Sequence, residues 1–247
     1  MKGKRPSCFI IQPGAFGDII TCAPIAKHFA DNNYEVFWAV HEKYREHLES
    51  ITSEYVTSVT LEDIPVAEGD DWLRVAAAQC YGLVPSYDMA LDLADRHPYG
   101  FRQLPSETPE EAKYRVSKVV PFEKKNHLSW KRNIKKEKTL YSKAVGDLGE
   151  YVIGALESSR GDKTAVPDSE TRRVVEITPQ PGYNIVDWFE VIARAKAVYC
   201  VESAVQCFVD GCMFQLPEEQ PKYLLKRSTI TNNKPYTVAK YWDLSYF

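Results

Sequence analysis

The sequence contains no apolar run of the roughly 18 to 20 residues that a membrane-crossing helix requires. It also shows no internal repeat and no low-complexity segment. The basic amino-terminal stretch MKGKRPSCFIIQPG has an apolar part that is too short for a signal peptide, and Pro13 and Gly14 interrupt it. The chain has 247 residues, of which 44% are apolar and 26% charged, the balance of an ordinary soluble globular protein. We therefore expect a cytoplasmic protein of one large domain or two small ones.

The cysteines form no CxxC pair, and the five histidines show no metal-ligand spacing with them. The cysteines are Cys8, Cys22, Cys80, Cys200, Cys207 and Cys212. Most of them lie in apolar runs, which predicts reduced, buried thiols. We expect no metal site and no cofactor.

A strong excess of charge of one sign is also missing, since the net charge is −3. The exception is KKNHLSWKRNIKKEK, residues 124–138, with seven basic residues and one acidic residue. This basic segment is either a solvated linker or helix face, or a patch that faces phosphate groups of a donor, an acceptor or a nucleic acid. In the second case Lys131 and Arg132 are candidates for acceptor binding, and Trp130 offers a stacking surface.

Apolar runs alternate with stretches of helical periodicity on both sides of the basic segment. The predicted strands are CFIIQ (8–12), YEVFWAV (34–40), VTSVTL (56–61), YDMALDL (87–93), EYVIGAL (150–156), TRRVVEI (171–177) and AVYCV (197–201). The predicted helices are 21–33, 70–80, 108–120, 184–195 and 202–211. This alternation predicts two α/β halves with Rossmann-like parallel sheets, residues 1–140 and 141–247. The aromatic-rich tail, from about residue 234, is expected to pack back on the amino-terminal half.

The first turn that carries chemistry is QPGAFGDIITCAP, which follows a predicted strand. Gly14 and Gly17 allow a tight turn and close approach of a ligand, with Phe16 between them. Asp18 then lies near the start of a helix, where a carboxylate is either a helix cap or a functional group. The pattern is not GxGxxG, so a dinucleotide site is not indicated.

Two further turns of this kind lie in the second half. ALESSRGDKTAVP places Ser158, Ser159, Arg160 and Lys163 after a strand, which suits a diphosphate grip or a polar surface loop. VYCVESAVQCF places Glu202 and Ser203 between a strand and a helix. There they could bind sugar hydroxyls or cap the helix.

In the order and spacing of these three turns, the sequence resembles the GT-B glycosyltransferases, and most closely the heptosyltransferase-like glycosyltransferase family 9. Members of that family begin with a strand, a short turn, Gly-Asp and a helix with an early proline, as in PGAFGDIITCAP. SSRGDK is similar to the family's second block. The third block departs from the family, because Glu202, Ser203 and Ala204 replace Asp-Ser/Thr-Gly. Cys207 also stands where the family has a histidine.

The resemblance implies two halves that face each other across a cleft and a metal-independent transfer of a sugar from a nucleotide-activated donor to a hydroxyl acceptor. Asp18 would be the general base. The donor-side residues would be Ser158, Ser159, Arg160, Lys163, Gly182, Glu202, Ser203 and Ala204. The acceptor-side residues would be Gly14, Phe16, Gly17, Lys131 and Arg132. The acceptor could be anionic, such as a lipid-linked sugar or a modified nucleic acid.

Two other functions remain open at this stage: a non-catalytic GT-B-like protein that binds a nucleotide or sugar, and another nucleotide-binding α/β enzyme. If Asp18 acts only in catalysis, Asp18→Asn should leave the fold intact.

Overall fold

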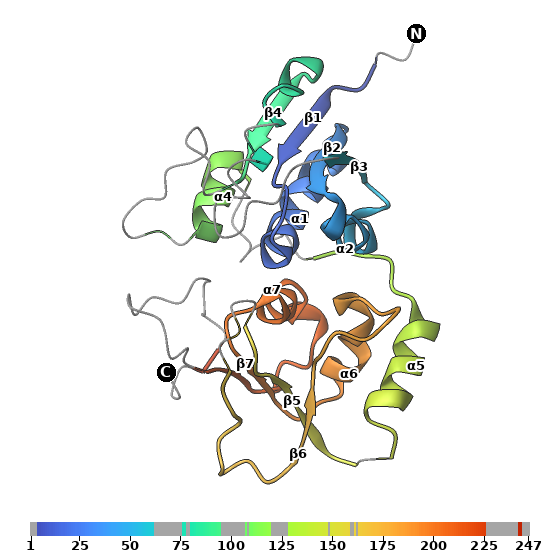
Figure 1. The fold of residues 1–247 in the computed structure, drawn as a ribbon, viewed down its shortest axis with the longest axis vertical. Coiled ribbons are helices and arrows are strands. Elements are labelled where there is room, and N and C mark those ends of the chain that lie inside the picture. Colours follow the sequence, from blue (N-terminus) through green and yellow to red (C-terminus); the bar gives the residue numbers. More distant parts are fainter. Residues whose placement is uncertain are drawn as a thin grey trace. The chain divides into compact units, whose positions relative to one another are not determined.

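The computed structural model separates by its internal contacts into two α/β units, residues 1–131 and 132–247 (Figure 1). It describes residues 4–61, 76–77, 80–94, 107, 109–119, 128–147, 149–158, 161, 163–225 and 242–243. The division precedes residue 140, so helix α5 (Ile134–Ala144) belongs wholly to the second unit.

The first unit contains a four-stranded parallel sheet of order β3-β2-β1-β4. Its strands are β1 (Ser7–Ile11), β2 (Glu35–His41), β3 (Val56–Leu61) and β4 (Met89–Asp92). Both faces of β1 are buried: Cys8 and Ile10 pack in one apolar cluster, and Phe9 and Ile11 pack in another. Burial on both faces explains why the predicted strands read as nearly continuous apolar runs.

Helices cover this sheet, and their starts differ in part from the predicted ones. They are α1 (Phe16–Asp31), α2 (Glu42–Thr52), α4 (Pro109–Ser117) and the 3₁₀ turn η1 (Val84–Ser86). Helix α1 begins at Phe16 rather than at residue 21, so Pro24 lies well inside the helix. Helix α2 was not predicted, because it is mostly polar and buries only Leu48, Ile51 and Thr52. The predicted helix 70–80 lies largely outside the described residues.

The second unit repeats the plan, with a parallel sheet of order β6-β5-β7-β8. Its strands are β5 (Tyr151–Ala155), β6 (Arg173–Glu176), β7 (Val198–Cys200) and the unpredicted three-residue β8 (Lys222–Leu224). Its helices are α5, α6 (Phe189–Ala193) and α7 (Ala204–Gly211), with the 3₁₀ turns η2 (Ile185–Trp188) and η3 (Met213–Gln215). Gly154 in β5 is needed for packing, since a Cβ there would lie 2.9 Å from Val174 Cγ1 of β6.

The described part of the tail joins the second unit. Trp242 Nε1 donates to Asp210 Oδ1 of α7 at 2.5 Å, and the Asp243 amide donates to the carbonyl of Lys222 at 2.7 Å. The remaining tail residues, 226–241 and 244–247, lie outside the described residues, as does any packing of theirs on the first unit. None of the helices in the described parts of the chain has the length and apolar character that a membrane crossing needs.

Each sheet has one point at which the strand order reverses. In the first unit the chain runs from β1 to β2 and β3 and then returns to place β4 on the other side of β1. In the second unit β6 lies on one side of β5, and β7 lies on the other. Ligands of open α/β sheets bind beyond the carboxyl ends of the strands at such points. The fold therefore marks two positions, one between β1 and β4 and one between β5 and β7.

A buried carboxylate next to β6 makes the stability of the second unit depend on pH. Arg172 Nε and Nη2 donate to Glu170 at 2.7 and 2.6 Å, and the Tyr199 hydroxyl donates to it at 2.9 Å. The hydrogen bonds from Arg172 are the largest cause that lowers the pKa of Glu170 to about 2. A depressed pKa of this kind stabilises the fold above the unfolded-state value of 4.5, and the contribution is lost as the pH falls toward 2.

We therefore expect Glu170→Gln to be less stable than wild type above about pH 5, with the difference closing toward about pH 2. Thermal melting of both proteins across this range measures the effect. A difference that stays constant with pH would show that Glu170 does not titrate in this way.

Candidate functional site

Asp18 is the third residue of α1, and a lysine from a distant helix holds it. The N-cap of α1 is Ala15, and no side chain caps this end, so the interpretation of Asp18 as a helix cap is wrong. Lys113 Nζ of α4 instead forms a hydrogen-bonded ion pair with Asp18 Oδ1. The Lys113 side chain is 1% exposed and that of Asp18 is 18% exposed. Asp18 is thus a partly accessible carboxylate with a buried cation behind it.

The turn before Asp18 is fixed by one hydrogen bond within the turn and by two from the neighbouring strand β2. Gln12 Nε2 donates to the carbonyl of Gly14, and the amide of His41 donates to Pro13 at 2.9 Å. Trp38 Nε1 of β2 donates to the carbonyl of Gln12 at 2.8 Å. Gly14 and Gly17 are not among the described residues with positive φ, so close packing or ligand access, not a left-handed backbone, would require glycine here.

One aromatic side chain, Phe16, and one carboxylate, Asp92, border the same turn. Phe16, a predicted acceptor-side residue, stacks on the His47 ring at a centroid distance of 4.3 Å. Asp92, the last residue of β4, lies opposite Ile11 of β1 in the parallel register and so at the strand reversal. It accepts hydrogen bonds from the Tyr81 hydroxyl and, at 3.0 Å, from the Ala94 amide. Sequence reasoning missed Asp92, because only the strand order places it next to the Asp18 turn.

The loop after β5 contains the first group of predicted donor residues. Ser158 is buried, and its carbonyl accepts from the Gly161 amide at 2.9 Å, where Gly161 has φ +81°. Lys163 Nζ lies 3.0 Å from Glu157 Oε2, and both side chains are exposed. Ser159 and Arg160 lie outside the described residues. A phosphate at this loop would therefore compete with Glu157 for Lys163.

The turn after β7 contains the second group. Glu202 is buried, Ser203 is the N-cap residue of α7, and Ala204 is the first residue of that helix. The Ser203 side chain makes no cap hydrogen bond, and its buried Oγ has no hydrogen-bond partner among the described residues. The interpretation of Ser203 as a side-chain helix cap is therefore wrong. An unsatisfied hydroxyl at a helix N-terminus suits an anionic or hydroxylated ligand.

The two donor groups meet at one edge of the sheet. Ala155 of β5 pairs with Cys200 of β7, so the loops that follow these strands leave the sheet side by side at the strand reversal. Gly182 lies after β6, the neighbour of β5, and its φ of +78° supports a turn closed by a 3.0 Å bond from Tyr183 N to Gln180 O. Cys207 is partly exposed in α7, where its amide donates to the Ser203 carbonyl. The structure thus brings the Ser158 loop and the Glu202 turn to one edge of the sheet.

The described residues of the basic segment differ in their contacts: some form ion pairs within the second unit, and others are exposed. Arg132 donates to Glu137 at 3.0 Å through Nε and at 2.5 Å through Nη2, and it stacks over Phe189. Lys136 Nζ lies 3.1 Å from Asp187 Oδ2. Lys131 is exposed, whereas Trp130 is only 9% exposed. Trp130 is therefore mainly a packing residue and not an open stacking surface.

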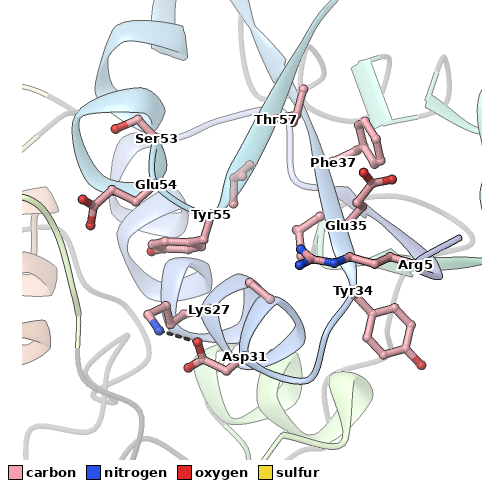
Figure 2. Close-up of a pocket in the computed structure, with 13 residues that line it drawn as sticks. Arg5, Lys27, Asp31, Tyr34, Glu35, Phe37, Ser53, Glu54, Tyr55 and Thr57 are labelled. Atoms are coloured by element: carbon pink, nitrogen blue, oxygen red, sulfur yellow. Dashed lines mark hydrogen bonds and ion pairs between the residues drawn. The ribbon is translucent and has the colours of Figure 1, made fainter. Parts of the chain in front are cut away.

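A pocket of about 500 Å³ in the first unit lies away from the Asp18 turn. It is lined by the amino-terminal ends of β2 and β3, at Glu35 and Val56, and by the last turns of α1. Figure 2 shows the Lys27–Asp31 ion pair and Tyr55 at its wall. Because Asp18 lies at the opposite end of α1, this pocket is not part of the candidate site. Within the described residues, no group of three or more His, Cys, Asp or Glu could hold a metal ion.

No protein-family model and no curated protein sequence matches the chain. In structure it is similar to E. coli heptosyltransferase WaaC with ADP-2-deoxy-2-fluoro heptose, at 14% identity and a TM-score of 0.50, over 93% of this chain and 91% of that chain. It is also similar to a glycosyl transferase family 9 protein from Veillonella parvula, at 10% identity and a TM-score of 0.53, over 91% of this chain and 81% of that chain. These likenesses confirm the predicted fold: the chain has the two-sheet α/β fold of the GT-B glycosyltransferases.

Proposed function

We propose that the protein is a glycosyltransferase that moves a sugar from a nucleotide-activated donor to a hydroxyl group of an acceptor. The observation that carries this proposal is the position of the three turns that contain the candidate binding and catalytic residues. The Asp18 turn follows β1, and the Ser158 and Glu202 turns follow β5 and β7. Each of these strands borders the strand reversal of its sheet. A protein that used these residues only as surface loops and caps would not need all three at the two ligand-binding positions.

In the proposed reaction Asp18 is the general base. The acceptor oxygen forms a bond to the anomeric carbon while the bond from that carbon to the diphosphate breaks. The acceptor proton passes to the Asp18 carboxylate, and the nucleoside diphosphate leaves. Lys113 holds Oδ1, which would orient the carboxylate toward the acceptor before the reaction.

The second unit would bind the donor. The Ser203 hydroxyl, the N-terminus of α7 and the Ser158 loop together offer hydrogen-bond donors for a diphosphate. Lys163 would exchange its exposed partner Glu157 for a phosphate oxygen and offset the charge of the leaving group. Glu202 would accept hydrogen bonds from sugar hydroxyls. The neighbour WaaC is named with an ADP-sugar analogue, which is in keeping with a nucleotide-sugar donor here.

One alternative has a specific observation in its favour. The Lys113–Asp18 pair could serve only to join α4 to α1, and the protein would then bind a nucleotide or sugar without turnover. The replacement of the family's glycine and histidine by Ala204 and Cys207 is in keeping with this alternative. Binding of a nucleoside diphosphate without release of one from any nucleotide sugar would favour it.

We expect Ser158→Ala combined with Ser159→Ala to weaken the binding of nucleoside diphosphates. Each lost hydrogen bond to a charged ligand costs at most about 1.5 to 3 kcal/mol. Calorimetric titration of the variant measures this loss, and Ser169→Ala, an exposed serine in the turn before β6, is the matched control. Equal affinities of the double variant and the control would place the donor site elsewhere.

A further inference from the structure

The outer face of α5 consists of five exposed side chains that line one shallow hollow. They are Ile134, Lys135, Lys138, Thr139 and Ser142, and they repeat with the spacing of a single helix face. The opposite face of the helix carries the buried side chains Glu137 and Leu140 and packs against α6. Contacts within the unit therefore explain the inner face and leave the outer face without a described role.

The cations of this region differ sharply in their contacts. Arg132 and Lys136 form ion pairs within the second unit, and Lys143 donates to Gln180 at 3.2 Å. Lys135 and Lys138 have no ion-pair partner among the described residues, and the hollow they line contains no carboxylate. Within helix α5, the positive charge that has no ion-pair partner among the described residues thus lies on the outer face.

An exposed apolar residue accompanies these lysines. Ile134, at the first position of α5, is 46% exposed. An aliphatic side chain next to lysines on one helix face suits the boundary between lipid headgroups and acyl chains. Single-stranded nucleic acid would pair its phosphates with lysines too, but its bases would in addition stack on aromatic rings or guanidinium groups. The nearby aromatic ring, that of Trp130, is largely buried. The nearby guanidinium group, that of Arg132, is held by Glu137.

We propose that the outer face of α5 binds the surface of an anionic lipid bilayer, with Lys135 and Lys138 at the headgroups and Ile134 inserted between them. The charge complementarity between two lysines without internal partners and a negative bilayer surface favours this occupant. The proposal concerns the second unit alone and does not rest on the proposed transfer reaction.

The test is co-sedimentation of the full chain with phosphatidylcholine vesicles that do or do not contain phosphatidylglycerol. Each lysine at an anionic surface strengthens binding about fivefold, so Lys135→Gln combined with Lys138→Gln should weaken it about 25-fold. Ile134→Ser should weaken it about fivefold. Lys4→Gln combined with Lys118→Gln removes the same charge from exposed positions of the first unit and should leave binding unchanged.

The proposal further requires binding to need phosphatidylglycerol and to fall when the ionic strength rises from about 0.1 M to about 0.5 M. Equal binding by wild type and the Lys135/Lys138 variant would overturn it. A parallel titration with a labelled single-stranded oligonucleotide tests whether this face binds a nucleic acid instead. Tight oligonucleotide binding that depends on both lysines but not on Ile134, without vesicle binding, would likewise overturn the proposal.

Discussion

Replacing Asp18 with asparagine should lower turnover by about 10² or more and also destabilise the first unit by about 3 kcal/mol. The first effect is the usual contribution of a general base. The second follows from Lys113, whose side chain is 1% exposed and would lose its counter-charge. The expectation that Asp18→Asn leaves the fold intact applies to a carboxylate with no buried partner. Because Lys113 is such a partner, we expect a loss of stability instead.

The two effects can be separated with a second substitution. Asp18→Asn combined with Lys113→Met removes both charges and fills the buried site with an apolar side chain of similar length, so most of the stability should return. Hydrogen exchange in α1 and α4 reports that stability, and release of nucleoside diphosphate reports activity. Recovery of activity together with stability would show that Asp18 only joins the two helices.

Replacing Arg132 with glutamine should destabilise the second unit by about 2 kcal/mol, because Glu137 is 1% exposed and would lose its two hydrogen bonds from the guanidinium group. The pKa of Arg132 is raised, chiefly by its hydrogen bonds with Glu137, as expected for a structural pair. Urea denaturation measures the loss. Arg132→Gln combined with Glu137→Gln should restore most of it.

Lys135→Gln is the matched control for Arg132, since it lies on the same segment and should change stability by less than about 0.5 kcal/mol. The assignment of Arg132 to acceptor binding makes the opposite prediction: stability near wild type and a raised apparent acceptor constant. A result of that kind would contradict the structural role of Arg132. The assignment of Lys131, which is exposed, to acceptor binding stays a prediction.

Much of the fold could be predicted because parallel strands buried on both faces have a clear pattern. The runs around Phe9, Trp38 and Ile153 are apolar at nearly every position and became β1, β2 and β5. Helix α2 and strand β8 could not be predicted in this way. The first has few apolar residues, and the second has only three residues, with its register set by β7.

The site could be predicted only where it is local in sequence. Gly14 to Asp18 and Glu202 to Ala204 each form one turn at a strand end, and such turns are visible in the sequence. The partner of Asp18 was not visible, because Lys113 is 95 residues away and only the packing of α4 brings it to α1. The position of Asp92 beside β1 likewise depends on strand order, and the contacts of Arg132 depend on the buried Glu137.

The most direct test of the proposed function is to incubate the protein with a panel of nucleotide sugars and measure released nucleoside diphosphate. Wild type should release the diphosphate from at least one donor. The stabilised variant Asp18→Asn with Lys113→Met should bind the same nucleotide sugar. It should cleave nucleoside diphosphate from that donor about 10² times more slowly. Release at the wild-type rate by that variant, or no release by the wild-type protein with any donor, would contradict the account.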